Sequence, residues 1–216
     1  MARIEIADEQ RRFETDPRKL EALARFVLAA EGRADRGLSI ALVDDRAIAR
    51  VHVDFLGVAG PTDVVSFPLE DEQDDLLGEV VVSTDTARRE ARERGLTFER
   101  EVFLYVVHGT LHLCGYDDHA PRDRKVMHAR QEELLESFLK GGLSASKSGR
   151  GSSRPRRSAS SGARSSRRTP EPRKIASPLE RATISRRVRP RGASGHGAVR
   201  TSKRKKRGTT DKRKRQ

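Results

Sequence analysis

The aromatic residues of this chain stop well before its end, which limits the part that can build a hydrophobic core. All nine Phe and Tyr residues lie within residues 1–140. Residues 141–216 hold 25 Lys and Arg against 3 Asp and Glu, whereas residues 1–140 hold 20 against 29. Apolar area is too scarce in the basic part to offset about 1–2 kcal/mol of backbone entropy per residue. The sequence predicts a folded domain over 1–140 and a disordered basic Ser/Arg/Lys-rich tail over 141–216.

Within the first 140 residues, strand-like and helix-like patterns follow one another. Apolar alternation and short apolar runs predict four strands, near residues 3–7, 38–43, 64–67 and 76–83. Helical spacing of apolar residues, punctuated by proline and glycine, predicts about five helices, near residues 17–31, 45–56, 84–94, 98–113 and 122–140. This interleaving predicts an α+β (mixed α/β) fold: a four-stranded mixed sheet packed with helices, with the helix over 98–113 in the interior.

The cellular compartment is constrained by what the chain lacks. Its first residues alternate charged and short apolar side chains, unlike a secretory signal or a transit peptide. No apolar run approaches the roughly 20 residues that span a bilayer. The single cysteine, Cys114, fits a reducing compartment and is expected to be a buried residue at a helix end. We expect a cytoplasmic protein that does not enter a membrane.

Two histidines have the spacing of metal ligands. His108 and His112 belong to the string HGTLHLCGYDDH, residues 108–119. Positions i and i+4 of a helix lie on one face, so both imidazoles can reach one ion at about 2.0–2.1 Å. Gly115 can end the helix and turn the chain back, which offers Asp118 or His119 as the third ligand. Three protein ligands leave one position for water or substrate, as in catalytic zinc sites.

The chemistry of such a site is metal-assisted hydrolysis. A zinc ion lowers the pKa of bound water to near 7, so His108 and His112 would be catalytic through that water. Zinc peptidases of the HExxH type need a glutamate beside the first histidine, and here that residue is Gly109. Cleavage of RNA can draw on the ribose hydroxyl of the substrate, so an RNA hydrolase is favoured over a peptidase.

Three strings in this order, PTDVVSFP (61–68), LLGEVVVS (76–83) and HGTLHLCGYDDH, resemble the YbeY family of bacterial endoribonucleases over residues 1 to about 140. The resemblance implies a single-strand-specific endoribonuclease that uses one Zn²⁺ ion. It also implies a role in rRNA maturation at the 3′ end of the small-subunit rRNA, and in ribosome quality control in the cytoplasm. RNA and the small ribosomal subunit are the implied partners.

The chain departs from the family pattern at two positions. The usual spacing is His-x3-His-x5-His, but Asp118 stands at the third position and His119 follows it, so either residue can be the third ligand. Leu56 stands where members often carry an arginine thought to hold RNA phosphate, so we assign no such contact. Of the other histidines, we expect His52 to be structural and His128 to be exposed on its helix.

The basic tail lies outside the resemblance. Its positive charge predicts contacts with RNA phosphates that offset the acidic domain, and without aromatic residues it is expected to add affinity rather than sequence preference. Two alternatives to the nuclease are an RNA-binding ribosome assembly factor that zinc only stabilises, and a zinc peptidase. Cleavage that depends on His112 and on the metal distinguishes the nuclease from both.

Overall fold

The computed structural model describes residues 2–69, 75–145 and 200–201. The strands are β1 (Ile4–Asp8), β2 (Gly37–Val43), β3 (Val64–Pro68), β4 (Leu76–Ser83) and β5 (Arg200–Thr201). The helices are α1 (Pro17–Ala30), α2 (Asp45–Leu56), α3 (Thr84–Arg94), α4 (Phe98–Leu113) and α5 (Pro121–Ala145). The predicted fold class is confirmed, because the four predicted strands and five predicted helices are all present in a mixed sheet.

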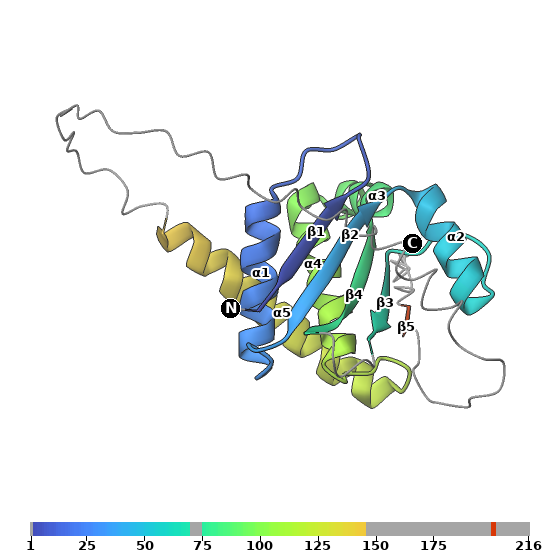
Figure 1. The fold of residues 1–216 in the computed structure, drawn as a ribbon. Helices are drawn as coiled ribbons and strands as arrows, with labels where there is room; N and C mark the ends of the chain where they lie inside the picture. Colours follow the sequence, from blue (N-terminus) through green and yellow to red (C-terminus); the bar gives the residue numbers. More distant parts are fainter. Residues whose placement is uncertain (1, 70–74, 146–199, 202–216) are drawn as a thin grey trace, which may run out of the picture.

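The sheet has the strand order β1-β2-β4-β3-β5 (Figure 1). Strands β1, β2 and β4 run parallel, while β3 runs antiparallel to β4 and β5 runs antiparallel to β3. The two-residue β5 comes from the basic segment and was not predicted. Antiparallel β3 can follow α2 through a short loop, whereas the parallel pairs require the helical connections α1 and α2.

The main core lies between one face of the sheet and the helices α1, α4 and α5 (Figure 1). Leu20, Leu23, Val27, Leu38, Ile40, Val80, Val106 and Leu111 are among its fully buried members. Helix α4 is buried along nearly its whole length because the run FLYVV gives it apolar side chains on every face. The prediction that the helix over residues 98–113 lies in the interior of the domain is therefore confirmed.

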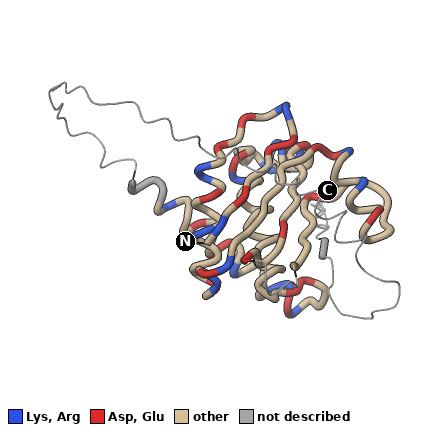
Figure 2. Tube along the Cα trace, in the orientation of Figure 1, with Lys and Arg blue, Asp and Glu red and all other residues tan. Residues whose placement is uncertain are grey.

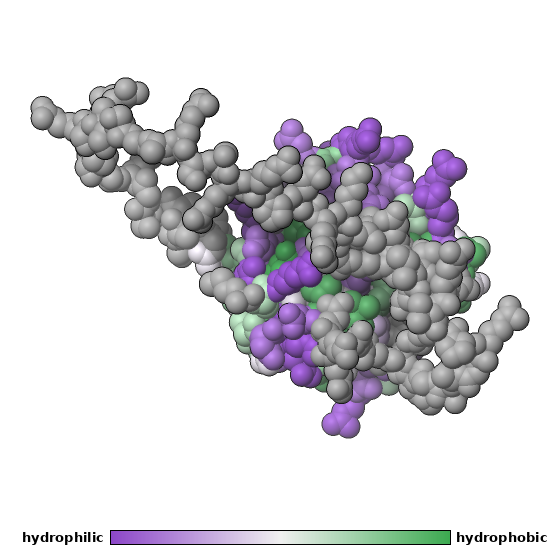
Figure 3. All heavy atoms as spheres, in the orientation of Figure 1, coloured by the Kyte–Doolittle hydropathy of each residue, from purple (hydrophilic) through white to green (hydrophobic). Residues whose placement is uncertain are grey.

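Helix α2 covers part of the opposite sheet face. It packs on β3 and β4 through a smaller cluster in which Phe55 meets Phe67 edge-on, with ring centroids 4.8 Å apart. Figure 3 shows hydrophobic residues over the sheet on this side, bordered by hydrophilic ones. One face of the sheet is thus covered by α1 and α4, with α3 and α5 packed beside them, and part of the other face is covered by α2.

Side-chain caps fix where the helices begin. Asp16, Asp44, Ser83 and Thr97 each accept a backbone N–H from the first turn of the helix that follows. Acidic and basic residues are interspersed over the outer helices and loops of the described chain (Figure 2). Among the described residues, none of the helices combines the length and the apolar character that crossing a bilayer demands.

Helix α4 approaches the sheet closely at Gly109. A Cβ atom added there would lie 2.6 Å from Val80 Cγ1 and 2.9 Å from Ser66 Oγ. The Ser66 hydroxyl also donates a hydrogen bond to the Gly109 carbonyl oxygen, at 3.0 Å. This position therefore has no room for the glutamate of an HExxH peptidase. Close packing against the sheet explains why a glycine stands there.

Candidate metal centre

The two helical histidines meet inside the domain. His108 and His112 are 5% and 6% exposed, on the last two turns of α4. Their Nε2 atoms lie 3.1 Å apart, and their rings are nearly perpendicular. Two nitrogens bound to one tetrahedral ion at about 2.0–2.1 Å lie about 3.3 Å apart, so the observed separation suits a shared cation.

Hydrogen bonds at the other ring nitrogens orient both imidazoles. His112 Nδ1 lies 3.1 Å from the carbonyl oxygen of Tyr116, and His108 Nδ1 lies 2.7 Å from Gln131 Oε1. A carbonyl oxygen can only accept, so Nδ1 of His112 carries its proton, and the Gln131 oxygen assigns the same tautomer to His108. Both Nε2 lone pairs then converge on one point, as in metal sites whose ligands are oriented by a second hydrogen bond.

Asp118 is the carboxylate that joins this pair. Gly115, with φ of 101°, turns the chain after α4, and Asp118 Oδ1 comes within 3.9 Å of His112 Nε2. The ligand atoms of His108, His112 and Asp118 all lie within 4.8 Å of one another. A buried imidazole pair and one carboxylate oxygen form a donor set that zinc and other first-row ions accept.

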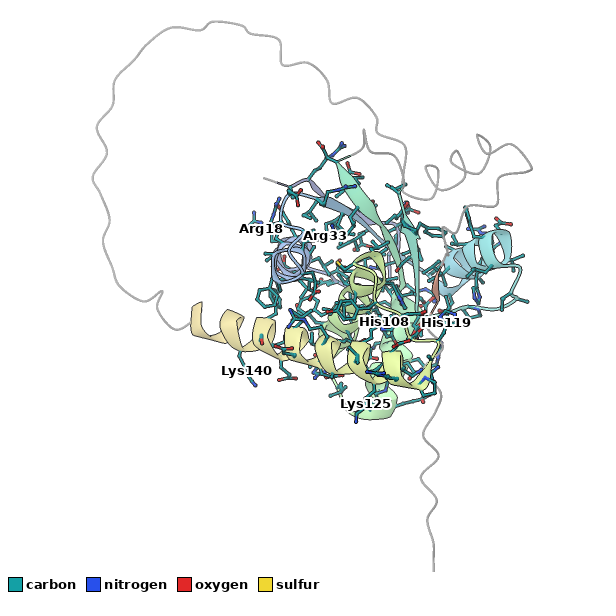
Figure 4. All side chains as sticks on the ribbon, turned by 90° about the horizontal axis from the view of Figure 1, so that it is seen from below. Arg18, Arg33, His108, His119, Lys125 and Lys140 are labelled. Atoms are coloured by element: carbon teal, nitrogen blue, oxygen red, sulfur yellow. The ribbon has the colours of Figure 1, made fainter. Side chains whose placement is uncertain are left out.

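His119 has a different environment. Its side chain is 73% exposed, against 13% for Asp118, and its Nδ1 lies 2.6 Å from Asp117 Oδ1. It forms a separate group with Asp117 and Asp118 at the surface, beside the start of α5. Figure 4 shows His119 in this loop and His108 on α4. The structure thus brings Asp118, and not His119, together with the two helical histidines.

Burial keeps the inner imidazole neutral. The pKa of His108 is lowered to about 4, first by its burial and then by the neighbouring charge of His112. A neutral imidazole is the form that binds a metal, so this environment favours coordination over protonation. Cys114 caps the end of α4, where burial raises the pKa of its thiol to about 11, and it is not part of the donor cluster.

The other histidines named from the sequence, and the loop residue Asp117, have structural partners. His52 is buried on α2 with Nδ1 2.9 Å from the Gly60 carbonyl oxygen, in line with its predicted structural role. Asp117 accepts the backbone N–H groups of Asp118 and His119, which makes it a turn-forming residue. The expectation for His128 is wrong: it is half-buried, with its ring centroid 6.4 Å from that of His108.

Sequence reasoning missed Gln131. It is buried on the inner face of α5, one helical turn after Met127, and it is the side chain that fixes the His108 ring. The sequence feature that could have identified Gln131 is its helical spacing from Met127, Leu134 and Leu135, which form the buried stripe of α5. A polar side chain in a buried stripe requires a hydrogen-bond partner. The partner itself lies 23 positions earlier in the chain.

Fold and cluster together define a class: a mixed α/β domain in which two buried histidines of the central helix and one carboxylate of the following loop form a group that could hold a metal ion. The family model described as Endoribonuclease YbeY matches residues 5–139, which include every member of the cluster. The chain belongs to the YbeY family.

Two named relatives support the same assignment, and one solved structure is also similar. The chain is 40% identical over 146 residues to "Endoribonuclease YbeY" of Frankia casuarinae, a match that covers 62% of this chain and 73% of the relative. It is 36% identical over 148 residues to the protein of the same name from Geobacter sulfurreducens, a match that covers 65% of this chain and 99% of the relative. The solution structure of TM1509 from Thermotoga maritima has 30% sequence identity to this chain and a TM-score of 0.48. The match covers 71% of this chain and 99% of TM1509.

Proposed function

We propose that this chain is a metal-dependent, single-strand-specific endoribonuclease that acts in rRNA maturation, at the 3′ end of the small-subunit rRNA, and in ribosome quality control. The observation that supports it most directly is the convergence of His108, His112 and Asp118 inside a domain of the YbeY family. The same family membership supports a cytoplasmic site of action on ribosomal RNA.

His108, His112 and Asp118 are the proposed ligands of one ion, and zinc is the ion that this donor set favours. When bound, such an ion polarises a phosphoryl oxygen and lowers the pKa of a bound water. Three protein donors converge among the described residues, which would leave one position of a tetrahedral ion for a reactant. We assign the third ligand to Asp118, because its carboxylate is near His112 while His119 faces solvent.

Residues around the histidine pair orient the two imidazoles and limit which side chains fit beside them. Tyr116 and Gln131 hold both Nδ1 protons, so the imidazoles cannot rotate away without breaking a hydrogen bond. Gly109 leaves no room for a protein general base beside His108. Without a glutamate there, the reaction would rely on a bound ion to activate water or on the ribose hydroxyl of RNA as the nucleophile, which suits RNA as the substrate better than a peptide.

The basic residues beyond 140 are the proposed phosphate-binding arm. Residues 1–140 carry an excess of acidic groups, and residues 141–216 carry the basic excess. Electrostatic contacts to phosphates weaken as salt rises, in proportion to the number of phosphates neutralised. A full chain in which arginines of residues 141–216 are replaced by serine is expected to bind RNA more weakly and with a shallower salt dependence, while the cleavage site stays the same.

The ligand assignment is tested with a matched pair of neighbouring substitutions. Asp118→Ala and His119→Ala are purified as full chains, and their metal content is measured by plasma mass spectrometry beside wild type. We expect Asp118→Ala to lose most of the stoichiometric metal and His119→Ala to keep it. The reverse pattern would assign the third ligand to His119.

The activity is tested on ribosomal RNA with an unpaired small-subunit 3′ end. We expect cleavage by wild type and by His119→Ala, and loss of cleavage in His112→Ala and after chelation, with recovery on adding zinc. Cleavage that persists in both His112→Ala and chelated protein would show that the ion has no part in the reaction. Metal binding without any RNA cleavage would instead support the zinc-stabilised assembly factor.

A further inference from the structure

An open pocket of about 850 Å³ lies at the edge of the sheet where the parallel strands β1, β2 and β4 end. The segments that follow these three strands line it, because the ends of parallel strands meet at one edge of a sheet. Arginines come from each segment: Arg12 after β1, Arg46 at the start of α2, and Arg88, Arg89 and Arg92 from α3.

The strand connections explain why a pocket forms there. Helix α1, which follows β1, packs into the main core, whereas α2, which follows β2, packs into the smaller cluster on the other face. Helix α3, which follows β4, returns to the main core through Ala87. Neighbouring connections therefore diverge toward opposite faces of the sheet. In open α/β sheets, the crevice at such a point is the usual place for a ligand.

The pocket and the metal centre lie toward different ends of β4. A Cβ atom at Gly78, near the start of β4, would lie 2.7 Å from Leu113 Cδ2, and Leu113 directly follows the metal-ligand candidate His112. Helix α3 begins at Thr84, directly after β4 ends at Ser83. Five strand residues span about 17 Å at about 3.3 Å each. A ligand in the pocket is therefore remote from the metal centre and defines a separate site.

The central acidic groups of the pocket already have partners within the fold. Asp85 accepts a hydrogen bond from Arg12 at 3.1 Å, and Asp45 accepts one from Arg89 at 3.1 Å. Asp45 also accepts the hydroxyl groups of Ser83 and Thr86, while Asp85 accepts the backbone N–H of Asp45. These carboxylates are held by internal contacts and leave the other arginines of the pocket without them.

Three arginines of the pocket, Arg46, Arg88 and Arg92, form no ion pair with another residue of the described chain. We name these three the pocket arginines. Arg46 and Arg92 are exposed, whereas Arg88 is half-buried. The Nε atom of Arg88 is shielded from solvent and has no hydrogen-bond acceptor among the described residues. A shielded donor without an acceptor is destabilising, so an anion that meets these guanidinium groups is favoured.

We propose that this pocket binds a phosphate group of an RNA strand that also reaches the metal centre. The planar fork of a guanidinium group matches phosphate oxygens in a bidentate arrangement, and three such groups without internal ion pairs meet here. Contacts to phosphate add affinity and position the strand without reading its sequence. The RNA as ligand rests on the proposed function, so the first test measures binding alone and is independent of cleavage.

The first test maps the modification of arginines by phenylglyoxal in the full chain, with the rate at each site measured by mass spectrometry. The probe is a single-stranded oligouridylate of about 12 nucleotides with 2′-O-methyl riboses, which spans about 40 Å at about 3.4 Å per nucleotide. We expect RNA to slow the modification of Arg46 and Arg92 about fivefold. Arg18 and Arg33, exposed and outside the pocket (Figure 4), are expected to react at an unchanged rate.

Three outcomes of this mapping would overturn the proposal. The first is unchanged modification of both Arg46 and Arg92 in the presence of RNA. The second is equal protection of Arg18 and Arg33, which would show that RNA covers the surface without a defined site. The third is protection by inorganic phosphate but not by RNA, which would make the pocket a site for free phosphate.

The second test compares matched pairs of substitutions in the kinetics of RNA cleavage. Arg46→Gln with Arg92→Gln removes two positive charges from exposed positions of the pocket, and Arg18→Gln with Arg33→Gln removes two from elsewhere. We expect the pocket pair to raise KM about five- to tenfold with kcat unchanged, because a phosphate contact far from the reacting bond is made equally in the ground and transition states. The control pair is expected to keep both constants.

A lysine pair separates phosphate recognition from charge alone. Arg46→Lys with Arg92→Lys keeps the charge but loses the forked donors, so it is expected to recover only part of the wild-type KM. A lower kcat at unchanged KM in the glutamine pair, or equal effects of the pocket and control pairs, would overturn the proposal. Protection of Arg46 and Arg92 by RNA in a protein that cleaves no RNA would support this site and refute the proposed function.

Discussion

Replacing glycine by alanine is expected to lower stability at Gly109, where α4 contacts the sheet, but not at Gly141. In Gly109→Ala, the new methyl group would meet Val80 Cγ1 at 2.6 Å and Ser66 Oγ at 2.9 Å. Overpacking of this kind costs about 1–3 kcal/mol, while alanine returns up to about 1 kcal/mol of helix propensity. The net loss is about 1–2 kcal/mol, or a fall in Tm of about 3–7 °C for a domain of this size.

Gly141→Ala is the matched control, because a Cβ at that position in α5 meets nothing within 4 Å. It is expected to leave the free energy of unfolding unchanged or raise it by about 0.5 kcal/mol through helix propensity. Both variants are compared with wild type by urea titration followed by circular dichroism. If Gly109→Ala proved as stable as Gly141→Ala, the close approach of α4 to β3 and β4 would be refuted.

Three further predictions concern single buried side chains. Glu101 is fully buried and pairs with Arg94, so Glu101→Gln is expected to lower the free energy of unfolding by about 2–4 kcal/mol in urea titration. Burial raises the pKa of Asp63 to about 6, so stability should rise as pH falls from 7 towards 4, and this rise should vanish in Asp63→Asn. Gln131→Leu is expected to weaken metal affinity about 10–100-fold in chelator competition, because His108 loses its orienting acceptor.

The sign of the Asp63 effect follows from proton linkage. Between pH 4 and 6 the folded state holds a proton on this carboxyl that the unfolded state has released, so acidification favours the folded state. A rise in the pKa of Asp63 from its ordinary value of 3.8 to about 6 corresponds to about 3 kcal/mol at most. A wild-type stability that fell over the same interval as steeply as that of Asp63→Asn would contradict the burial of the charged form.

The fold could be predicted from local patterns where those patterns were strong. The run FLYVV with two histidines at i and i+4 defines one buried helix, and its observed bounds, Phe98–Leu113, match the expected ones. Helix α5 was expected to end near Lys140 but extends to Ala145, because no proline or charge run stops it. Strand β5 had no signal, since two residues in a basic segment carry no periodicity.

The donor cluster was only partly predictable, for a geometric reason. The helix spacing alone places His108 beside His112, but the choice between Asp118 and His119 depends on how the chain leaves Gly115 and enters α5. A rotation of one residue in such a turn exchanges an inward side chain for an exposed one. His128 was misjudged for a related reason, because it borders the buried stripe that contains Met127 and Gln131.

The proposed centre also couples the site to the packing of the last helix. His108 and His112 come from α4, Asp118 from the loop, and Gln131 from α5, so the full set exists only when α5 is packed against α4. An ion held by the first two elements, with its ligand oriented by the third, binds the folded state and not the unfolded one, and so stabilises this packing. The converging Nε2 atoms, 3.1 Å apart, carry lone pairs that repel without a shared cation or proton. Loss of the ion is therefore expected to loosen the α4–α5 contact first, and the distant β1–β2 pairing least.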